Sequence, residues 1–188
     1  MLNADDIRAE LLDSYRDYCT DVSEPGMAMS LQTGTFLLWL CRARQPVTVA
    51  DYGSGWSSYV LRLYAQQSGA TVTSVDTDPD WLQATCEFLA AQQMPTDGLM
   101  LWEDYRHTHT VHDLIFHDLA NGVMREATMH DAVERCIPGG VVIFDDAHHE
   151  SHHNAARQVC GRYGMRLVDM DDVTKDGMGR FCAAAEKP

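Results

Sequence analysis

The 188-residue sequence contains no long apolar run. Its longest apolar stretch, Phe36 to Cys41, is far shorter than the roughly 18 residues that a membrane-spanning helix needs, so we expect no contact with a membrane. Residues 1–16 include Asp5, Asp6 and Glu10, whereas a secretory signal begins with basic residues followed by an apolar segment. We therefore expect a cytoplasmic protein.

Basic side chains are few. The sequence has 14 Lys and Arg residues and 28 Asp and Glu residues, which gives a formal net charge of -14. Proteins that bind nucleic acids take much of their affinity from Lys and Arg that neutralise phosphates, and no basic run occurs in this sequence. The composition therefore argues against DNA or RNA as a partner and favours a small-molecule substrate.

Paired cysteines are also missing. The six cysteines are scattered, without a C-x-x-C pair, and several lie within apolar patterns. This distribution predicts buried free thiols in a reducing compartment rather than disulfides or a zinc site.

The order of apolar and turn-forming segments predicts an α/β fold. Helical patterns cover residues 5–19 and 30–44, and the chain then alternates between short apolar strands and helices. The expected strands lie at 47–50, 70–75, 99–102, 113–117 and 141–144. Such alternation predicts a doubly wound, mostly parallel sheet with helices on both faces.

Two further strands, at 166–170 and 180–184, are expected to form an antiparallel hairpin at one edge of this sheet, which brings it to seven strands. We expect residues 46–188 to form a Rossmann-like core. Residues 1–45 would contribute helices on the substrate side of the same domain.

A glycine-containing loop, Asp51-Tyr52-Gly53-Ser54-Gly55, follows the first strand of the alternation. Ligands of such sheets bind beyond the carboxyl ends of the strands, where glycines let them approach the main chain. Asp76 ends the next strand and could accept hydrogen bonds from ribose hydroxyls, as in NAD and S-adenosylmethionine sites. Ser58 stands where an NAD loop has its third glycine. The alternative is a tight turn with a helix-capping acid.

The sequence resembles the class I S-adenosylmethionine-dependent methyltransferases from about residue 30 to the C-terminus. The matching segments are VTVADYGSGWSSYVL, VTSVDTDPDWLQ, LWEDYR, DLIFHDLAN and PGGVVIFDDAHH. The resemblance implies that the glycine loop follows the methionine part of the cofactor, that Ser57 or Ser58 reaches its carboxylate, and that Asp104 or Glu103 faces the adenine. The complete implied cofactor site comprises Asp51, Gly53, Ser54, Gly55, Ser58, Asp76, Thr77, Asp104 and Asp118.

Three acids follow the fourth and fifth expected strands: Asp118, Asp145 and Asp146. Strand ends converge in a parallel sheet, and clustered carboxylates repel one another unless a cation or hydrogen bonds compensate them. Oxygen ligands favour Mg²⁺, Mn²⁺ or Ca²⁺. The positions are similar to those in metal-dependent O-methyltransferases acting on catechols and caffeoyl-CoA and in macrocin-type enzymes, although the Lys that the catechol type carries after the first acid is missing. Capping or loop hydrogen bonds are the alternative.

Four histidines follow these acids: His148, His149, His152 and His153. Three interpretations stay open. His148 or His149 acts as a general base or contacts the acceptor, because imidazole titrates near neutrality. Alternatively, the four form a solvated helix start, or their spacing of four residues serves to bind Zn²⁺ or Ni²⁺. His117 either faces the site or packs inside, and His112 is expected in a solvated loop.

The sequence thus predicts transfer of a methyl group from S-adenosylmethionine to an oxygen, less readily a nitrogen, of a small molecule. The catalytic candidates are His148, His149 and Asp118. A divalent metal at the three acids would lower the pKa of the acceptor hydroxyl. A non-catalytic S-adenosylmethionine-binding module and a minimal NAD-type oxidoreductase are the alternative functions. The oligomeric state stays open, with a homodimer as one candidate.

Overall fold

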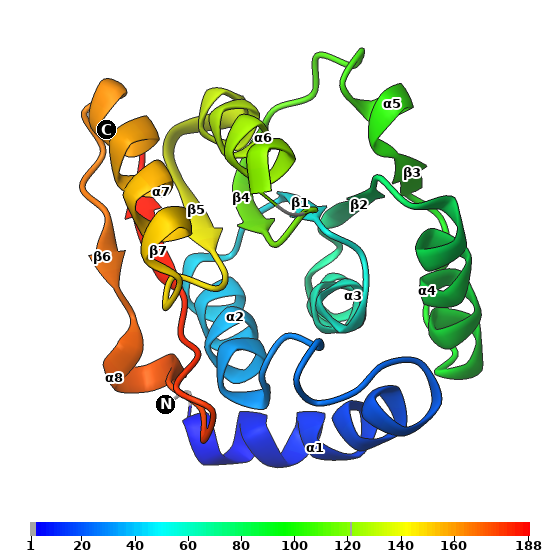
Figure 1. Ribbon diagram of the computed structural model, residues 1–188. Coiled ribbons are helices and arrows are strands. Elements are labelled where there is room, and N and C mark those ends of the chain that lie inside the picture. Colours follow the sequence, from blue (N-terminus) through cyan, green and yellow to red (C-terminus); the bar gives the residue numbers. More distant parts are fainter. Residues whose placement is uncertain (1–2, 121) are drawn as a thin grey trace.

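A seven-stranded sheet lies at the centre of the computed structural model, which describes residues 3–120 and 122–188 (Figure 1). Its order is β3-β2-β1-β4-β5-β7-β6. The first five strands run parallel, and β7 runs antiparallel to both β5 and β6. The strands are β1 (Thr48–Tyr52), β2 (Thr71–Asp76), β3 (Leu99–Leu101), β4 (His112–His117), β5 (Cys136–Phe144), β6 (Val168–Asp169) and β7 (Ala183–Glu186).

Helices cover both faces of the sheet (Figure 1). They are α1 (Ala4–Asp21), α2 (Leu31–Arg44), α3 (Trp56–Ser68), α4 (Pro79–Ala91), α5 (Trp102–Tyr105), α6 (Gly122–Arg135), α7 (Glu150–Arg162) and α8 (Asp171–Thr174). Neighbouring side chains of a strand point to opposite faces. Leu114 and Phe116 of β4 therefore join a core with α1–α4, whereas Ile115 joins a second core with α6 and α7. The doubly wound α/β prediction is confirmed.

The C-terminal strands form the predicted antiparallel edge, but they differ from the prediction in their bounds and their connection. Strand β7 begins at Ala183, three residues later than expected, and it lies between β5 and β6, so that β6 is the edge strand. The short helix α8 fills the connection that was expected to be a loop. Antiparallel pairing with β5 buries Ala183–Ala185, which explains why such a small-residue segment belongs to the sheet.

Two other expectations are corrected near α5. Trp102 belongs to this helix rather than to the third strand. His112, expected in a solvated loop, is the first residue of β4 and is buried, with its Nε2 2.9 Å from the hydroxyl of Tyr105. A buried tyrosine needs a polar partner, and the histidine supplies one.

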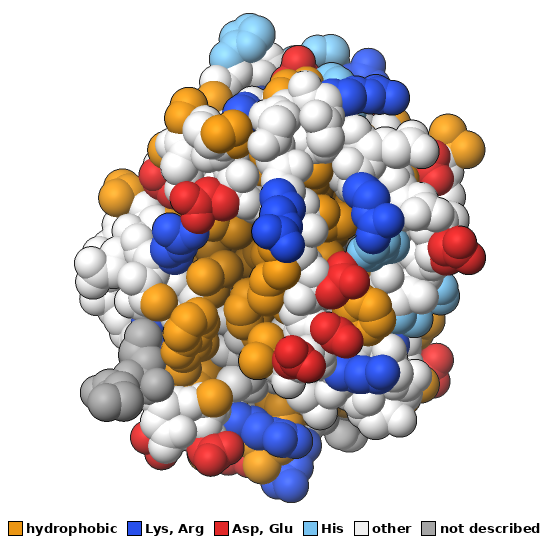
Figure 2. All heavy atoms as spheres, turned by 90° about the vertical axis from the view of Figure 1, so that its left-hand side faces the viewer, with side chains coloured by type: hydrophobic (Ala, Val, Ile, Leu, Met, Phe, Trp, Pro, Cys, Tyr) orange, Lys and Arg blue, Asp and Glu red, His pale blue; other side chains and the backbone are white. Residues whose placement is uncertain are grey.

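No helix within the described residues is long and apolar enough to cross a membrane. Figure 2 shows apolar side chains gathered on the face that carries β6 and α8. Val168 of β6 and Val173 of α8 are 42% and 59% exposed there. The homodimer considered from the sequence stays a prediction, and sedimentation analysis can test it.

Candidate functional site

A cavity of about 700 Å³ opens at the carboxyl ends of β1, β2, β4 and β5. The loops after these strands line it together with residues 26–30, Tyr18 of α1, and Met178 and Arg180. This is the edge where ligands of open parallel sheets bind, and the volume lies within the roughly 300–1,000 Å³ of small-molecule sites.

The glycine loop, Asp51–Gly55, passes between the ends of two neighbouring strands. Gly53 N–H donates to the carbonyl of Val75 (2.9 Å), and Asp118 N–H donates to the carbonyl of Tyr52 (2.6 Å). Gly53 has φ +102°, and a Cβ there would stand 2.5 Å from the Asp118 carbonyl oxygen. A side chain would therefore be strained both by its backbone conformation and by contact. Glycine allows the loop to lie flat against the end of β4, with its open side facing the cavity.

Asp76, at the end of β2, binds this loop directly. One carboxylate oxygen accepts hydrogen bonds from Ser54 N–H (2.9 Å) and Ser54 Oγ (3.1 Å), and the other accepts from Asp78 N–H (3.1 Å). Asp76 lines the cavity although it is only 7% exposed, and this burial raises its pKa. The carboxylate is thus held in one orientation, with acceptor capacity left toward the cavity.

Asp51 and Ser58 lie behind the loop rather than on the cavity wall. Ser58 Oγ donates to Asp51 Oδ2 (2.5 Å) and accepts from Gly55 N–H (3.2 Å). Both residues are fully buried, and burial raises the pKa of Asp51 to about 6. They support the loop from beneath, whereas Ser57, the other serine considered for the cofactor carboxylate, does line the cavity.

Two further expected cofactor residues also lie outside the cavity wall, which makes four of the nine with Asp51 and Ser58. Thr77, after β2, and Asp104, in α5, are both exposed, and neither lines the cavity. Trp81 does line it and donates from Nε1 to the Ser54 carbonyl (2.6 Å), which adds a further tie to the glycine loop.

The three acids meet on the cavity wall as expected, but they surround an arginine. The Arg125 guanidinium, carried by α6, is 2.5 Å from Asp118 Oδ1 and 3.2 Å from Asp146 Oδ2. It also donates to the carbonyl of Asp145 (3.4 Å), and Arg125 is only 3% exposed. The sequence reasoning overlooked this residue, although its place in the helix after the strand-four acid was a usable signal.

An all-oxygen cation site formed by Asp118, Asp145 and Asp146 does not fit this arrangement. A guanidinium already compensates two of the three carboxylates, and one cation beside another is unfavourable. Burial raises the pKa of Asp118 and that of Asp145, the latter to about 6, and the charge of Arg125 opposes both shifts. The cost of placing these acids together is therefore offset within the chain itself.

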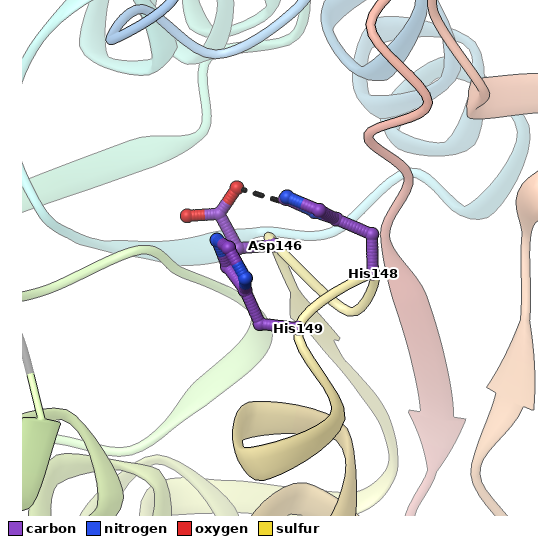
Figure 3. A group of neighbouring side chains, drawn as sticks. All are labelled: Asp146, His148 and His149. Atoms are coloured by element: carbon purple, nitrogen blue, oxygen red, sulfur yellow. Dashed lines mark ion pairs between the residues drawn. The ribbon is translucent and has the colours of Figure 1, made fainter.

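Asp146, His148 and His149 form a second cluster on the same wall (Figure 3). His148 Nδ1 lies 3.7 Å from Asp146 Oδ1, and the two imidazole centroids are 4.0 Å apart. Burial lowers the pKa of His148, against the opposing effect of Asp146. His152 also lines the cavity, with its ring 5.2 Å from that of His149.

The remaining histidines lie outside the cavity wall. His153 pairs instead with Asp169, at 2.6 Å between Nε2 and Oδ1. His117 packs inside, fully buried, with its Nε2 2.8 Å from Thr128 Oγ1. Of the four clustered histidines, three therefore face the cavity and one does not.

Arg180 joins the C-terminal loop to the N-terminal segment at the cavity rim. Its guanidinium donates to the carbonyls of Pro25 (2.8 Å), Gly26 (3.0 Å) and Ala28 (2.9 Å), and Asp176 holds it at 2.8 Å. Segments about 150 positions apart thus form one rim. Spacing along the sequence could not reveal this contact.

No family model and no curated protein matches the chain by sequence. Solved structures do match it. The O-methyltransferase TomG from Streptomyces achromogenes, solved with S-adenosylmethionine, aligns at TM-score 0.66 and 15% identity, over 97% of this chain and 90% of that one. The Podospora anserina methyltransferase PaMTH1, bound to S-adenosylhomocysteine, aligns at TM-score 0.66 and 14% identity, over 100% of this chain and 89% of that one.

An O-methyltransferase from Bacillus cereus, in complex with S-adenosylhomocysteine, aligns at TM-score 0.65 and 15% identity, over 100% of this chain and 93% of that one. Because these alignments run over nearly the whole of each chain, they establish the fold. The chain has the fold of the class I S-adenosylmethionine-dependent methyltransferases.

Proposed function

We propose that the chain transfers a methyl group from S-adenosylmethionine to an oxygen of a small molecule. One observation carries the proposal: the cavity has the glycine loop and Asp76 on one wall and an acid and imidazole cluster on the other. The likeness in fold to O-methyltransferases supports oxygen, with nitrogen as the less favoured acceptor atom.

The cofactor side of the cavity suits the two polar parts of S-adenosylmethionine. Asp76 is placed to accept hydrogen bonds from the ribose hydroxyls, and the N-terminus of α3, at Trp56 and Ser57, presents N–H groups to a carboxylate. Thr77 and Asp104 stay candidates for the outer, adenosine end. The bound cofactor would supply a methyl group on an electrophilic sulfonium.

The opposite wall would position the acceptor and remove its proton. A C–O bond forms as the C–S bond breaks, and the acceptor proton must leave toward a base. His148 and His149 lie on that wall, and imidazole suits the task because it titrates near neutrality. Asp118, held by Arg125, would orient the acceptor. Positioning alone contributes a large part of such a rate enhancement.

Calorimetry with S-adenosylhomocysteine and with NAD⁺ tests the cofactor assignment. We expect S-adenosylhomocysteine to bind and NAD⁺ not to bind. Asp76→Asn should weaken binding at least about tenfold, because a charged acceptor that compensates buried hydroxyls is lost. Asp172→Asn, at an exposed position, is the matched control. Binding of NAD⁺ alone would overturn the proposal in favour of an oxidoreductase.

Methyl transfer itself is tested with labelled S-adenosylmethionine and a panel of phenol, catechol and sugar hydroxyls. We expect transfer to at least one acceptor and a loss in His149→Ala that exceeds any loss in His130→Ala, a half-buried position that does not line the cavity. Tight cofactor binding with no transfer to any of these acceptors would favour a non-catalytic binding module.

A further inference from the structure

Asp146, His148 and His149 present three metal-ligating atoms that all lie within 4.8 Å of one another on the cavity wall. Figure 3 shows the carboxylate and the two rings turned toward one another from the turn that leads into α7. Two ligands bound about 2.1 Å from one ion stand no more than about 4.2 Å apart. Small side-chain rotations would therefore bring the three atoms into one coordination sphere.

Two imidazole nitrogens at this wall are buried without a hydrogen bond to any described residue. His148 Nδ1 is buried and has no hydrogen-bond partner among the described residues, and the same holds for Nδ1 of the neighbouring His152. A buried nitrogen without a partner costs free energy, so this arrangement is favourable only with a ligand or solvent at the lone pair.

Arg125 prepares Asp146 for such a role. Its guanidinium binds Asp146 Oδ2 at 3.2 Å and leaves Oδ1 toward His148. Ligating carboxylates are commonly oriented in this way by a hydrogen bond from a second residue. Because Arg125 lies between Asp118 and Asp146, a cation is directed away from Asp118 and toward the side of Asp146 that carries Oδ1 and the imidazoles.

We propose that Asp146, His148 and His149 bind one divalent transition-metal ion of the Zn²⁺ or Fe²⁺ kind. Two imidazoles and one carboxylate suit these ions, whereas Mg²⁺ prefers oxygen ligands. Three protein ligands leave open positions, as in catalytic metal sites, and here the three ligands line the cavity. If the proposed methyl transfer holds, an acceptor hydroxyl can bind there, its pKa lowered by the ion, and the imidazoles then act as ligands rather than as the base.

Titration of untagged, chelator-treated protein with Co²⁺ tests the site, because the visible absorption of Co²⁺ reports nitrogen and oxygen ligands. We expect one Co²⁺ per chain, displaced by Zn²⁺ and not by Mg²⁺. His149→Ala and His148→Ala should each weaken binding by more than the 10- to 100-fold that loss of an outer partner causes. His130→Ala, outside the cavity, should leave it unchanged.

Asp145→Asn and Asp118→Asn separate this site from an all-oxygen one. We expect both variants to retain Co²⁺, since neither residue is a ligand. Loss of the ion in these two variants with retention in His149→Ala would overturn the proposal, as would the absence of stoichiometric Co²⁺ binding. Calorimetry with S-adenosylhomocysteine on the same samples keeps the hypotheses apart. Cofactor binding without Co²⁺ binding defeats only the metal site, whereas Co²⁺ binding without cofactor binding defeats the proposed function.

Discussion

The guanidinium of Arg125 lies 2.5 Å from Asp118 Oδ1, within a wall of carboxylates that faces the cavity. This ion pair joins the end of β4 to α6 and, through Asp146, to the turn after β5. It compensates the negative charge at the point where the sequence alone suggested a bound cation.

Arg125→Met should lower the free energy of unfolding at pH 7 by about 3–5 kcal/mol, because it leaves the partly buried carboxylates of Asp118 and Asp146 without their counter-charge. Urea denaturation measures the change. Arg106→Met removes an exposed pair with Glu103 (3.4 Å) and should cost less than about 1 kcal/mol. Equal, small losses in the two variants would show that the Arg125 pair contributes little to stability.

Asp51→Asn should change how stability depends on pH. The carboxyl has a pKa of about 6 in the folded chain against 3.8 as the reference value, so the folded state binds this proton more tightly. Its favourable contribution is complete below about pH 4 and is lost as the pH rises through about 6. Asparagine does not titrate. Between pH 4 and pH 7, the free energy of unfolding of the variant should therefore rise by about 3 kcal/mol relative to that of the wild type.

Urea denaturation of the apo protein at several pH values measures this gain. Asp13→Asn, whose side chain is 92% exposed, controls for the change of residue type. A difference between Asp51→Asn and wild type that stays constant from pH 4 to pH 7 would contradict the assignment of a buried, titrating Asp51.

Gly53→Ala should weaken S-adenosylhomocysteine binding at least about tenfold and lower stability by about 1–3 kcal/mol. The reason is a left-handed φ of +102° combined with a Cβ only 2.5 Å from the carbonyl oxygen of Asp118. Calorimetry and thermal unfolding measure the two effects. At Gly177, an added Cβ meets no described atom within 4 Å, and alanine should be tolerated there. Normal cofactor affinity in Gly53→Ala would mean that the loop adapts freely.

Arg180→Gln should loosen the rim segment at residues 25–28. The guanidinium donates to three carbonyl oxygens of that segment, and the glutamine amide cannot reach all of them. Hydrogen exchange followed by mass spectrometry should show faster exchange in peptides covering this segment and no change in peptides of β4. Arg44→Gln, which removes an exposed pair with Glu186, is the control. Unchanged protection at 25–28 would mean that other contacts hold the segment.

How well the sequence predicted each site residue depends on whether a strand end or a longer-range contact places that residue. Asp76 and Gly53 could be singled out because each stands at the end of an apolar strand, and strand ends share one edge of a parallel sheet. Asp104 and Thr77 occupy matching motif positions, yet they lie outside the cavity wall, because the short helix α5 and the turn after β2 leave both residues exposed. Motif position specifies the strand end and does not specify the loop conformation that follows it.

By itself, the sequence determined the alternation of strands and helices, the glycine loop and the convergence of the acids, since these depend on local periodicity and on the common edge of parallel strands. Only the tertiary structure decided that Arg125 lies between Asp118 and Asp146, that Arg180 joins residues 25–28 to the C-terminal loop, and that His149 faces the cavity whereas His153 does not. The physical reason is that the contacts of long side chains depend on charge and on proximity in the folded chain. The spacing of the residues along the sequence carries no information about that proximity.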